Sequence, residues 1–415
     1  MSCASAARSS CPAAIGAGRV SPTAAFYLLA SITITFLAGS SAPTPLYPLY
    51  QAKWGFSPIT ITVVFAVYAL GLLGTLLIAG RLSDHIGRRP VLVAATLAHA
   101  ASMLIFSTAS GVGDLLIARV IQGVSAGAAI AAVGAGMLDL DKARGTIANA
   151  ITPALGTATG GIASGLMVHF LPAPMHLVYL VLGAALLAQA VGVALMTETT
   201  APRPGALGSL KPRFSVPAAT RRPLLVAVPA LAAPWAFAGF YASLGPLLMH
   251  STFGLDSSLF GGLALFILAG SAAVSIFLLR RYDAAFMTSV GASSLLAGVT
   301  AVMLALSYQS PAAFFLGTVL AGAGFGTSVQ GAIGIVIPFA PPSQRAGVLS
   351  VIFLVSYLAM GAPAVVAGYL VAHGGNISII AREFGGAVMI LATLALLGAV
   401  AKRWSQGPSR PPVRK

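Results

Sequence analysis

The chain has 415 residues, of which 58% are hydrophobic and 7% are charged, and its formal net charge is +15. Because soluble domains carry about 25% charged residues, this composition excludes a soluble fold. The positive charges are not gathered in one segment, as a nucleic-acid-binding surface would require, but fall in short clusters between apolar runs. The sequence therefore predicts a polytopic helical membrane protein with no nucleic-acid partner.

Twelve apolar runs follow one another along the chain, and each is long enough to cross a hydrocarbon core of about 30 Å as a helix. They form two groups of six, separated by a segment rich in proline and basic residues. The runs lie at roughly 23–44, 58–80, 90–108, 114–138, 145–169, 176–197, 223–249, 257–279, 285–308, 312–337, 345–372 and 379–401. We therefore expect an all-α membrane protein with twelve transmembrane helices.

The two groups match each other at a nearly constant offset, which indicates a duplicated six-helix unit. Four pairs are 199 residues apart: Arg81 with Arg280, Asp84 with Asp283, Gly123 with Gly322 and Gly127 with Gly326. The expected segments are an N-terminal tail at 1–22, a first bundle at 23–197, a linker at 198–222, a second bundle at 223–401 and a C-terminal tail at 402–415. Two pseudo-symmetric six-helix bundles are the fold that this pattern predicts.

Basic residues set the expected orientation of the chain. With the N-terminus in the cytoplasm, 20 of the 23 lysines and arginines fall in cytoplasmic segments. Reversing the protein would invert that count, which the positive-inside rule disfavours. The cysteines, Cys3 and Cys11, both lie in the N-terminal tail, which suits a reducing compartment. We expect an inner (plasma) membrane protein with the tails and the linker in the cytoplasm.

The segment at 80–90, here called the hinge, joins the second and third runs. It reads Gly80-Arg-Leu-Ser-Asp84-His-Ile-Gly87-Arg88-Arg89-Pro. This G-x-L-x-D-x-x-G-R-R spacing resembles the loop signature of the major facilitator superfamily, although a histidine, residue 85, follows the aspartate in place of the usual basic residue. The resemblance implies a secondary transporter whose two bundles surround a central cavity that opens alternately to each side.

In a transporter of this kind, we expect the hinge to act as a conformational switch. Asp84 would accept hydrogen bonds from the start of the eleventh helix, near Arg345, when the cytoplasmic side is closed. Arg88 and Arg89 would pair with Asp139 or Asp141 below the fourth helix.

The fourth helix contains an arginine, Arg119, more than one turn from its start, followed by Gln122 and Gly123. An intramembrane arginine is costly unless it faces a water-filled cavity or a partner, so it is a candidate functional residue. R-x-x-Q-G also resembles a fourth-helix motif of the superfamily that implies a role in the cavity and in proton coupling. The structural alternative is that Arg119 extends to the outer interface or pairs with Asp114.

The fifth helix carries a strip of small residues, Gly156, Gly160 and Gly161, with Pro153 one turn earlier. It resembles the antiporter motif G-P-x-x-G-G of drug–proton exporters, with Thr157 where that motif has proline. The resemblance implies antiport. Close helix packing would explain the same small residues.

The substrate pocket is expected on the first and seventh helices, where hydroxyl and aromatic side chains gather; lipid-facing aromatics are the alternative. The candidates are Thr33, Thr35, Phe36, Trp235, Phe237 and Tyr241. None of the eight acidic residues lies clearly in mid-membrane, so no proton-binding carboxylate can be named. His99 on the third helix can titrate or simply pack.

These features predict a proton-coupled exporter of small amphipathic compounds or drugs. The alternative is a sugar or metabolite carrier working by proton symport or uniport, and a third class is a membrane sensor or scaffold. No metal-ligand spacing, nucleophile elbow or phosphate loop occurs, so we expect no enzyme, no metal and no cofactor beyond the proton gradient. The expected partners are a small-molecule substrate, protons and the lipid bilayer, and we expect a monomer.

The orientation is tested by fusing reporters that are active only in the cytoplasm or only outside it. Fusions at Gly205, in the linker, and at Lys415 should both show cytoplasmic activity. Activity of either fusion on the outer side would contradict the predicted topology.

Overall fold

The computed structural model describes the backbone of residues 19–406 and the side chains of 19–401, except residues 213, 215, 256 and 257. Every element in this part of the chain is a helix. The first half contains α1 (Pro22–Ser41), η1 (Thr44–Leu46), α2 (Tyr47–Trp54), α3 (Pro58–Ala79), α4 (Ser83–Ile86), α5 (Arg88–Ser107), α6 (Val112–Leu140), α7 (Lys142–Phe170), α8 (Pro174–Ala194) and α9 (Ala206–Ser209). The second half contains α10 (Ala218–Phe253), α11 (Ser258–Leu279), α12 (Ala284–Ser307), α13 (Pro311–Val336), η2 (Ile337–Phe339), η3 (Pro342–Gln344), α14 (Arg345–Ala372) and α15 (Ile377–Gln406).

Twelve spans in the described part are long and apolar enough to cross a membrane, so the predicted fold class is confirmed. The first span is longer than its apolar run, because η1 and α2 continue it from Pro22 to Trp54. The seventh span begins at Ala218, inside the segment that the sequence assigned to the linker.

Local sequence explains where many of these helices begin. Proline occupies the first turn of four long helices, where its missing N–H costs nothing: Pro22, Pro58, Pro174 and Pro311. Asp141 begins α7 by accepting a hydrogen bond from the Arg144 N–H at 2.9 Å. Asp283 begins α12 in the same way, through the Phe286 N–H at 2.9 Å. These two carboxylates are therefore used as N-caps.

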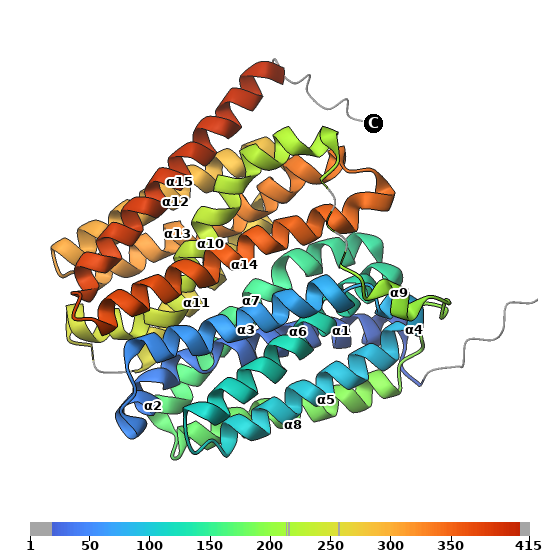
Figure 1. Cartoon of the computed structure of the whole chain (residues 1–415), viewed down its shortest axis with the longest axis horizontal. Coiled ribbons are helices and arrows are strands. Elements are labelled where there is room, and N and C mark those ends of the chain that lie inside the picture. Colours follow the sequence, from blue (N-terminus) through green and yellow to red (C-terminus); the bar gives the residue numbers. More distant parts are fainter. Residues whose placement is uncertain (1–18, 213, 215, 256–257, 407–415) are drawn as a thin grey trace, which may run out of the picture.

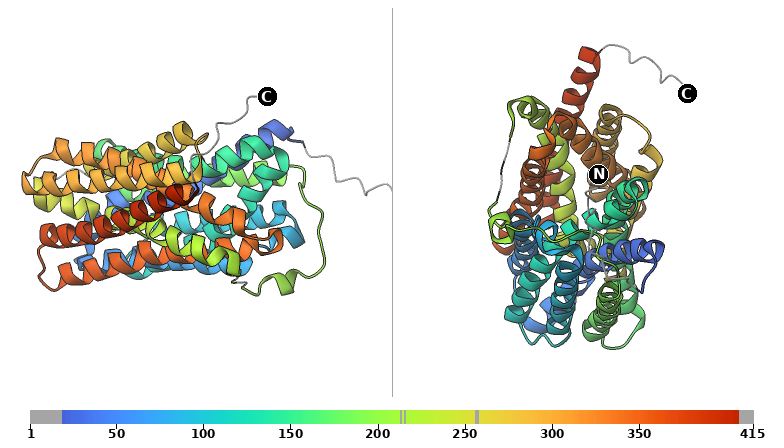
Figure 2. Two further views of the ribbon diagram at one scale, coloured as in Figure 1. Left: turned by 90° about the horizontal axis from the view of Figure 1, so that it is seen from above. Right: turned by 90° about the vertical axis from the view of Figure 1, so that its right-hand side faces the viewer.

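The helices form two bundles that lie side by side. In Figure 1 the first half, coloured blue to green, lies below the second half, coloured yellow to red. Figure 2 shows the same division along the helices, seen from the end that carries α4 and α9. We call this the hinge end, and we call the end that carries α2 the opposite end. Each half has its own buried apolar core.

The two halves meet along α7 with α11 and along α3 with α14. Glycine makes the first contact possible: a Cβ on Gly161 would lie 2.9 Å from the Leu265 Cβ, and a Cβ on Gly262 would clash with the Gly161 carbonyl oxygen. On the other side, a Cβ on Gly368 would clash with the Thr62 side chain. All of these positions lie toward the opposite end, where the backbones of the two halves approach most closely.

Replacing Gly262 with valine should therefore open the opposite end, because the added side chain cannot fit against the α7 backbone. The readout is thiol labelling of a cysteine introduced at Ser243, which is buried there, after Cys3 and Cys11 have been replaced. We expect labelling to become several-fold faster. Gly270→Val is the matched control on the same helix, because a Cβ at 270 meets nothing within 4 Å. Equal labelling in both variants would contradict this role for the glycine contact.

Candidate functional site

Arg119 is the one charged side chain in the described part that is fully enclosed, with 0% of its surface exposed. Its Nη1 donates to the Ser40 carbonyl at 3.0 Å and to Gln122 Oε1 at 2.6 Å, and its Nη2 donates to the Tyr47 hydroxyl at 2.6 Å. Among the described residues, no carboxylate lies within ion-pair distance. Asp114 instead accepts hydrogen bonds from Ser110. The structure thus shows neither interface extension nor pairing with Asp114.

Three aromatic rings, and no carboxylate of the described residues, lie next to the Arg119 guanidinium. The guanidinium carbon lies 5.5–5.9 Å from the ring centres of Tyr47, Tyr68 and Phe106, which come from three different helices. The negative faces of such rings attract a cation, and this attraction is strongest where water is excluded. The Nε of Arg119 is buried and has no hydrogen-bond partner.

The end of α1 supplies the acceptors for this cluster. The last carbonyls of a helix lack N–H partners and carry the negative end of its dipole. Pro43 has no N–H, so it leaves the Gly39 carbonyl free, and Gln122 Nε2 donates to that oxygen at 3.0 Å. The next carbonyl, of Ser40, accepts from Arg119. The R-x-x-Q pair therefore caps the C-terminus of α1, which the order of residues along α6 could not reveal.

Gly123, the third residue of the motif, faces α3 and not the polar cluster. A Cβ there would lie 2.5 Å from the Tyr68 carbonyl oxygen and 3.0 Å from the Leu72 nitrogen. Glycine lets α6 approach α3 closely enough for the Tyr68 ring to reach Arg119.

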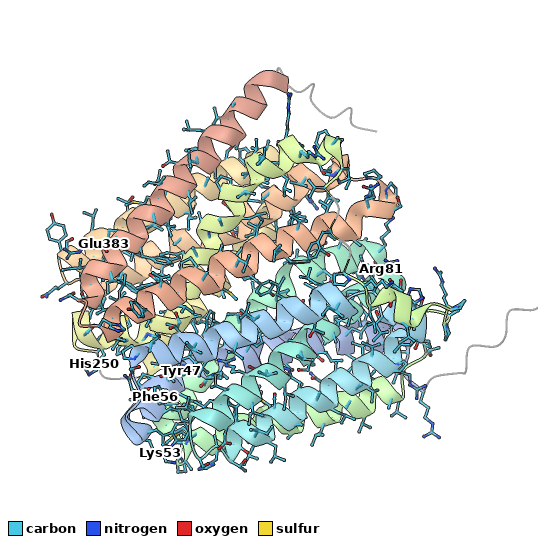
Figure 3. The ribbon with its side chains drawn as sticks, viewed as in Figure 1. Tyr47, Lys53, Phe56, Arg81, His250 and Glu383 are labelled. Atoms are coloured by element: carbon cyan, nitrogen blue, oxygen red, sulfur yellow. The ribbon has the colours of Figure 1, made fainter. Side chains whose placement is uncertain are left out.

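A cavity of about 320 Å³ lies between the halves at the opposite end. This volume is within the usual range for small-molecule sites. Its walls come from α2, α3, α10 and α11, and its polar groups are Tyr47, Gln51, Ser243, His250 and Ser258. Figure 3 shows Tyr47 and His250 near one another at this end, far from Arg81. Tyr47 thus forms part of the cavity wall while its hydroxyl contacts Arg119. This cavity could not be predicted from the sequence, because its walls come from helices that are distant along the chain.

The hinge collects several of the expected residues. Gly87 has φ +100°, which favours glycine, and a Cβ on it would lie 2.6 Å from Glu198 Oε2. The buried Arg88 side chain pairs with Asp84 and donates to Ser83 Oγ at 2.7 Å and to Asp139 Oδ2 at 3.3 Å. Gly80 ends α3 just before this cluster.

Sequence reasoning missed Glu198, which organises the start of α5. Its carboxylate accepts the Arg88 N–H at 2.8 Å and the Arg89 N–H at 3.0 Å, so it caps a helix whose own N-cap residue is glycine. The Arg89 side chain donates to the Ala194 carbonyl at the end of α8. An acid directly after the sixth run was the available signal.

Three expected hinge contacts are not made in this structure. Arg89 donates to the Ala194 carbonyl and forms no ion pair with Asp139 or Asp141 among the described residues. Asp141 caps α7 and pairs with Arg144 at 3.5 Å, apart from Arg88. The Asp84 side chain is 46% exposed, and its ion pair is with Arg88 of the same hinge, not with the start of α14. Because the halves approach each other closely at the opposite end, the expected contact of Asp84 with α14 stays a prediction for a conformation that is closed at the hinge end.

The glycines of α7 divide between two neighbours. A Cβ on Gly156 would lie 2.6 Å from the Ile34 carbonyl oxygen, and one on Gly160 would clash with Ala38, so both face α1. Gly161 faces α11 of the other half. Pro153 lies inside the helix one turn before this strip. The strip therefore packs α7 against α1 on one side and against α11 of the other half on the other side.

The expected pocket residues do not form one pocket. Thr33 is buried, Thr35 accepts from Gln189 at 2.8 Å, and Phe36 packs on His99 with ring centres 4.1 Å apart. In the second half, Phe237 and Tyr241 lie in the apolar core. Of the six, Trp235 alone belongs to the cluster that joins the halves, where it packs against Phe65, Ala69 and Met360.

Comparison with known proteins identifies the family. The Major Facilitator Superfamily profile matches residues 29–362. Multidrug resistance protein MdtL of Klebsiella pneumoniae subsp. pneumoniae is 28% identical over 349 residues, which cover 78% of this chain and 83% of that protein.

Two solved structures share the fold. The nucleoside transporter NupG (D323A mutant) superposes with a TM-score of 0.67 at 12% identity, over 91% of this chain and all of that one. A bacterial homologue of the human lysosomal transporter Spinster, inward-facing and unoccupied, gives 0.69 at 15% identity, over 95% of this chain and all of that one. This chain is a multi-pass membrane transporter, not an enzyme, and it belongs to the major facilitator superfamily.

Proposed function

We propose that this transporter exports small amphipathic compounds across the inner membrane and couples that export to proton entry. The observation that carries the proposal is Arg119, an enclosed cation without a carboxylate, which contacts a wall of the cavity between the halves through Tyr47. A buried charge is expensive to maintain and typically marks a transport pathway. The apolar cavity with a few polar groups suits amphipathic molecules. The name of the MdtL relative supports export of drugs.

Transport would proceed as the two halves rock against each other, so that the hinge end and the opposite end open in turn. Opening the opposite end would separate Tyr47 and Gln51 of the first half from Ser243 and His250 of the second half, and so would widen the cavity. Gly80, Asp84, Gly87, Arg88, Arg89 and Asp139 would bias that equilibrium. Exposed ion pairs contribute only about 0–1 kcal/mol each, but 1.4 kcal/mol changes a two-state ratio about tenfold.

The proposal is tested with purified protein in liposomes that contain a pH-sensitive dye. Under an imposed pH gradient, dyes and antibiotics should move against their own gradients while protons move the opposite way, and an uncoupler should abolish both. Substrate movement in the same direction as protons, with sugars or other metabolites as substrates, would replace the proposal with the carrier alternative. Substrate transport at an unchanged rate in the presence of the uncoupler would contradict the proton coupling in this proposal.

Arg119→Ala should lower this transport more than about tenfold, because the cavity wall loses the charge behind Tyr47. The protein should still insert and fold, since the lost residue is a buried charge that is costly to hold. Arg119→Lys should retain part of the activity, because it keeps the charge but not the planar donor set.

The matched control is Arg382→Ala, which removes an exposed arginine on α15. Thermal unfolding of the purified variants checks their folding. Wild-type transport rates in Arg119→Ala would show that Arg119 has only a structural role.

A further inference from the structure

Proton coupling needs a group that can exchange a proton inside the membrane, and the carboxylates of this chain are poorly placed for that task. Seven of the eight lie in the described part, and Asp256 lies outside it. Each of the seven is in a loop or within two turns of a helix end: Asp84, Asp114, Asp139, Asp141, Glu198, Asp283 and Glu383. The proton carrier must therefore be sought among other side chains.

His99 lies in the middle of α5 and is fully buried. Its Nδ1 lies 2.9 Å from the Ser125 Oγ, and that hydroxyl donates its single proton to the Gln122 carbonyl at 2.9 Å. Ser125 can therefore only accept from the ring, so we assign the proton of the neutral imidazole to Nδ1. Nε2 is left with a bare lone pair, and it has no hydrogen-bond partner.

This lone pair faces α1 at a glycine. A Cβ on Gly39 would lie 2.9 Å from His99 Nε2 and 3.7 Å from Gln122 Nε2, so the ring nitrogen and the amide adjoin the same small space. Gln122 in turn accepts from Arg119. The Phe36 ring covers one face of the imidazole. His99, Gln122 and Arg119 therefore lie in sequence against the end of α1.

Few other titratable or charged groups surround this ring. Among the described residues of the elements packed on α5, Arg119 of α6 is the charged side chain in the same polar cluster. Phe36 and Gly39 of α1 lie against the ring, and Tyr27 of α1 is exposed. Tyr179 of α8 is bonded to the Tyr50 hydroxyl at 3.2 Å. The remaining charged and histidine groups lie at the two ends of the bundle: Asp84, His85, Arg88, Arg89, Asp114, Asp139 and His176. The charge of an imidazolium at residue 99 would therefore act mainly on Arg119, by electrostatic repulsion.

We propose that His99 carries the coupling proton, an inference that rests on the proton-coupled export proposed above. When α1 moves, water reaches Nε2 and relays to it a proton from hydronium in the outer solution, which becomes water. The neutral ring becomes an imidazolium, while Nδ1–H stays hydrogen-bonded to Ser125. The new charge repels Arg119 and loosens its bonds to Gln122 and Tyr47, which changes a wall of the cavity. Release of the proton from Nε2 to water on the other side restores the neutral ring.

The test compares two reactions of the same purified protein in liposomes. Substrate exchange at equal pH on both sides needs no net proton movement, whereas uphill transport under a pH gradient does. His99→Asn keeps an amide donor near Ser125 but takes no proton. It should lose uphill transport and substrate-induced proton movement by more than about tenfold while it keeps exchange. His373→Asn, which changes an exposed histidine at the end of α14, is the matched control.

The outcomes separate this inference from the function on which it rests. Wild-type protein that moves no protons would overturn the proposed function itself. Coupled transport by both the wild type and His99→Asn would overturn only the role of His99. If His99→Asn does not fold, Gly39→Ala takes its place, because the added methyl group occupies the space beside Nε2 and should also uncouple transport. Full coupling in that variant would contradict the inference.

Discussion

A guanidinium enclosed without a carboxylate is the constraint on which the first half of this transporter depends. Removing such a charge from water costs several kcal/mol unless dipoles and rings replace the lost hydration. Here the replacements are the carbonyl of Ser40, the amide of Gln122, the hydroxyl of Tyr47 and three aromatic faces. Ser40 and Tyr47 lie on the two sides of the break between α1 and α2, and the other groups come from α3, α5 and α6. A movement of α1 relative to α6 would therefore change the hydrogen bonds that stabilise Arg119.

The second half repeats the fold without the charge. At the offset of 199 residues, Arg119 corresponds to Thr318 and Gln122 to Ala321, while His99 corresponds to Gly298. A Cβ on Gly298 would clash with the Ala321 nitrogen, so the backbones of α12 and α13 are in close contact here. In the first half, the side chains of His99 and Gln122 occupy the corresponding positions. Thr318 bonds to the hydroxyl of Tyr241 at 3.0 Å. The enclosed Arg119–Gln122 pair is therefore a feature of the first half, and the second half contributes Ser243, His250 and Ser258 to the cavity between the halves.

The sequence predicted those features that depend on local order. Apolar length gave the twelve spans, and the spacing from Gly80 to Arg89 gave the family. It failed where a residue acts on a distant helix. Glu198 reads as a linker acid, yet it caps α5, more than 100 residues earlier in the chain. Tyr241 reads as a pocket aromatic, but the packing of α10 against α13 turns it into the core. The bare nitrogen of His99 depends on a hydroxyl of α6, which no pattern along α5 could show.

We infer that transport requires Arg119 to remain without a full counter-charge, and the substitution Gln122→Glu would supply that charge. Glutamate is nearly the same size as glutamine and would place a carboxylate where Oε1 now accepts from Arg119 at 2.6 Å. The variant pairs the guanidinium but loses the donor to the Gly39 carbonyl. We expect it to fold, as checked by thermal unfolding, and to transport more than about tenfold more slowly than the wild type. Transport at the wild-type rate, with the carboxylate in place, would contradict this inference.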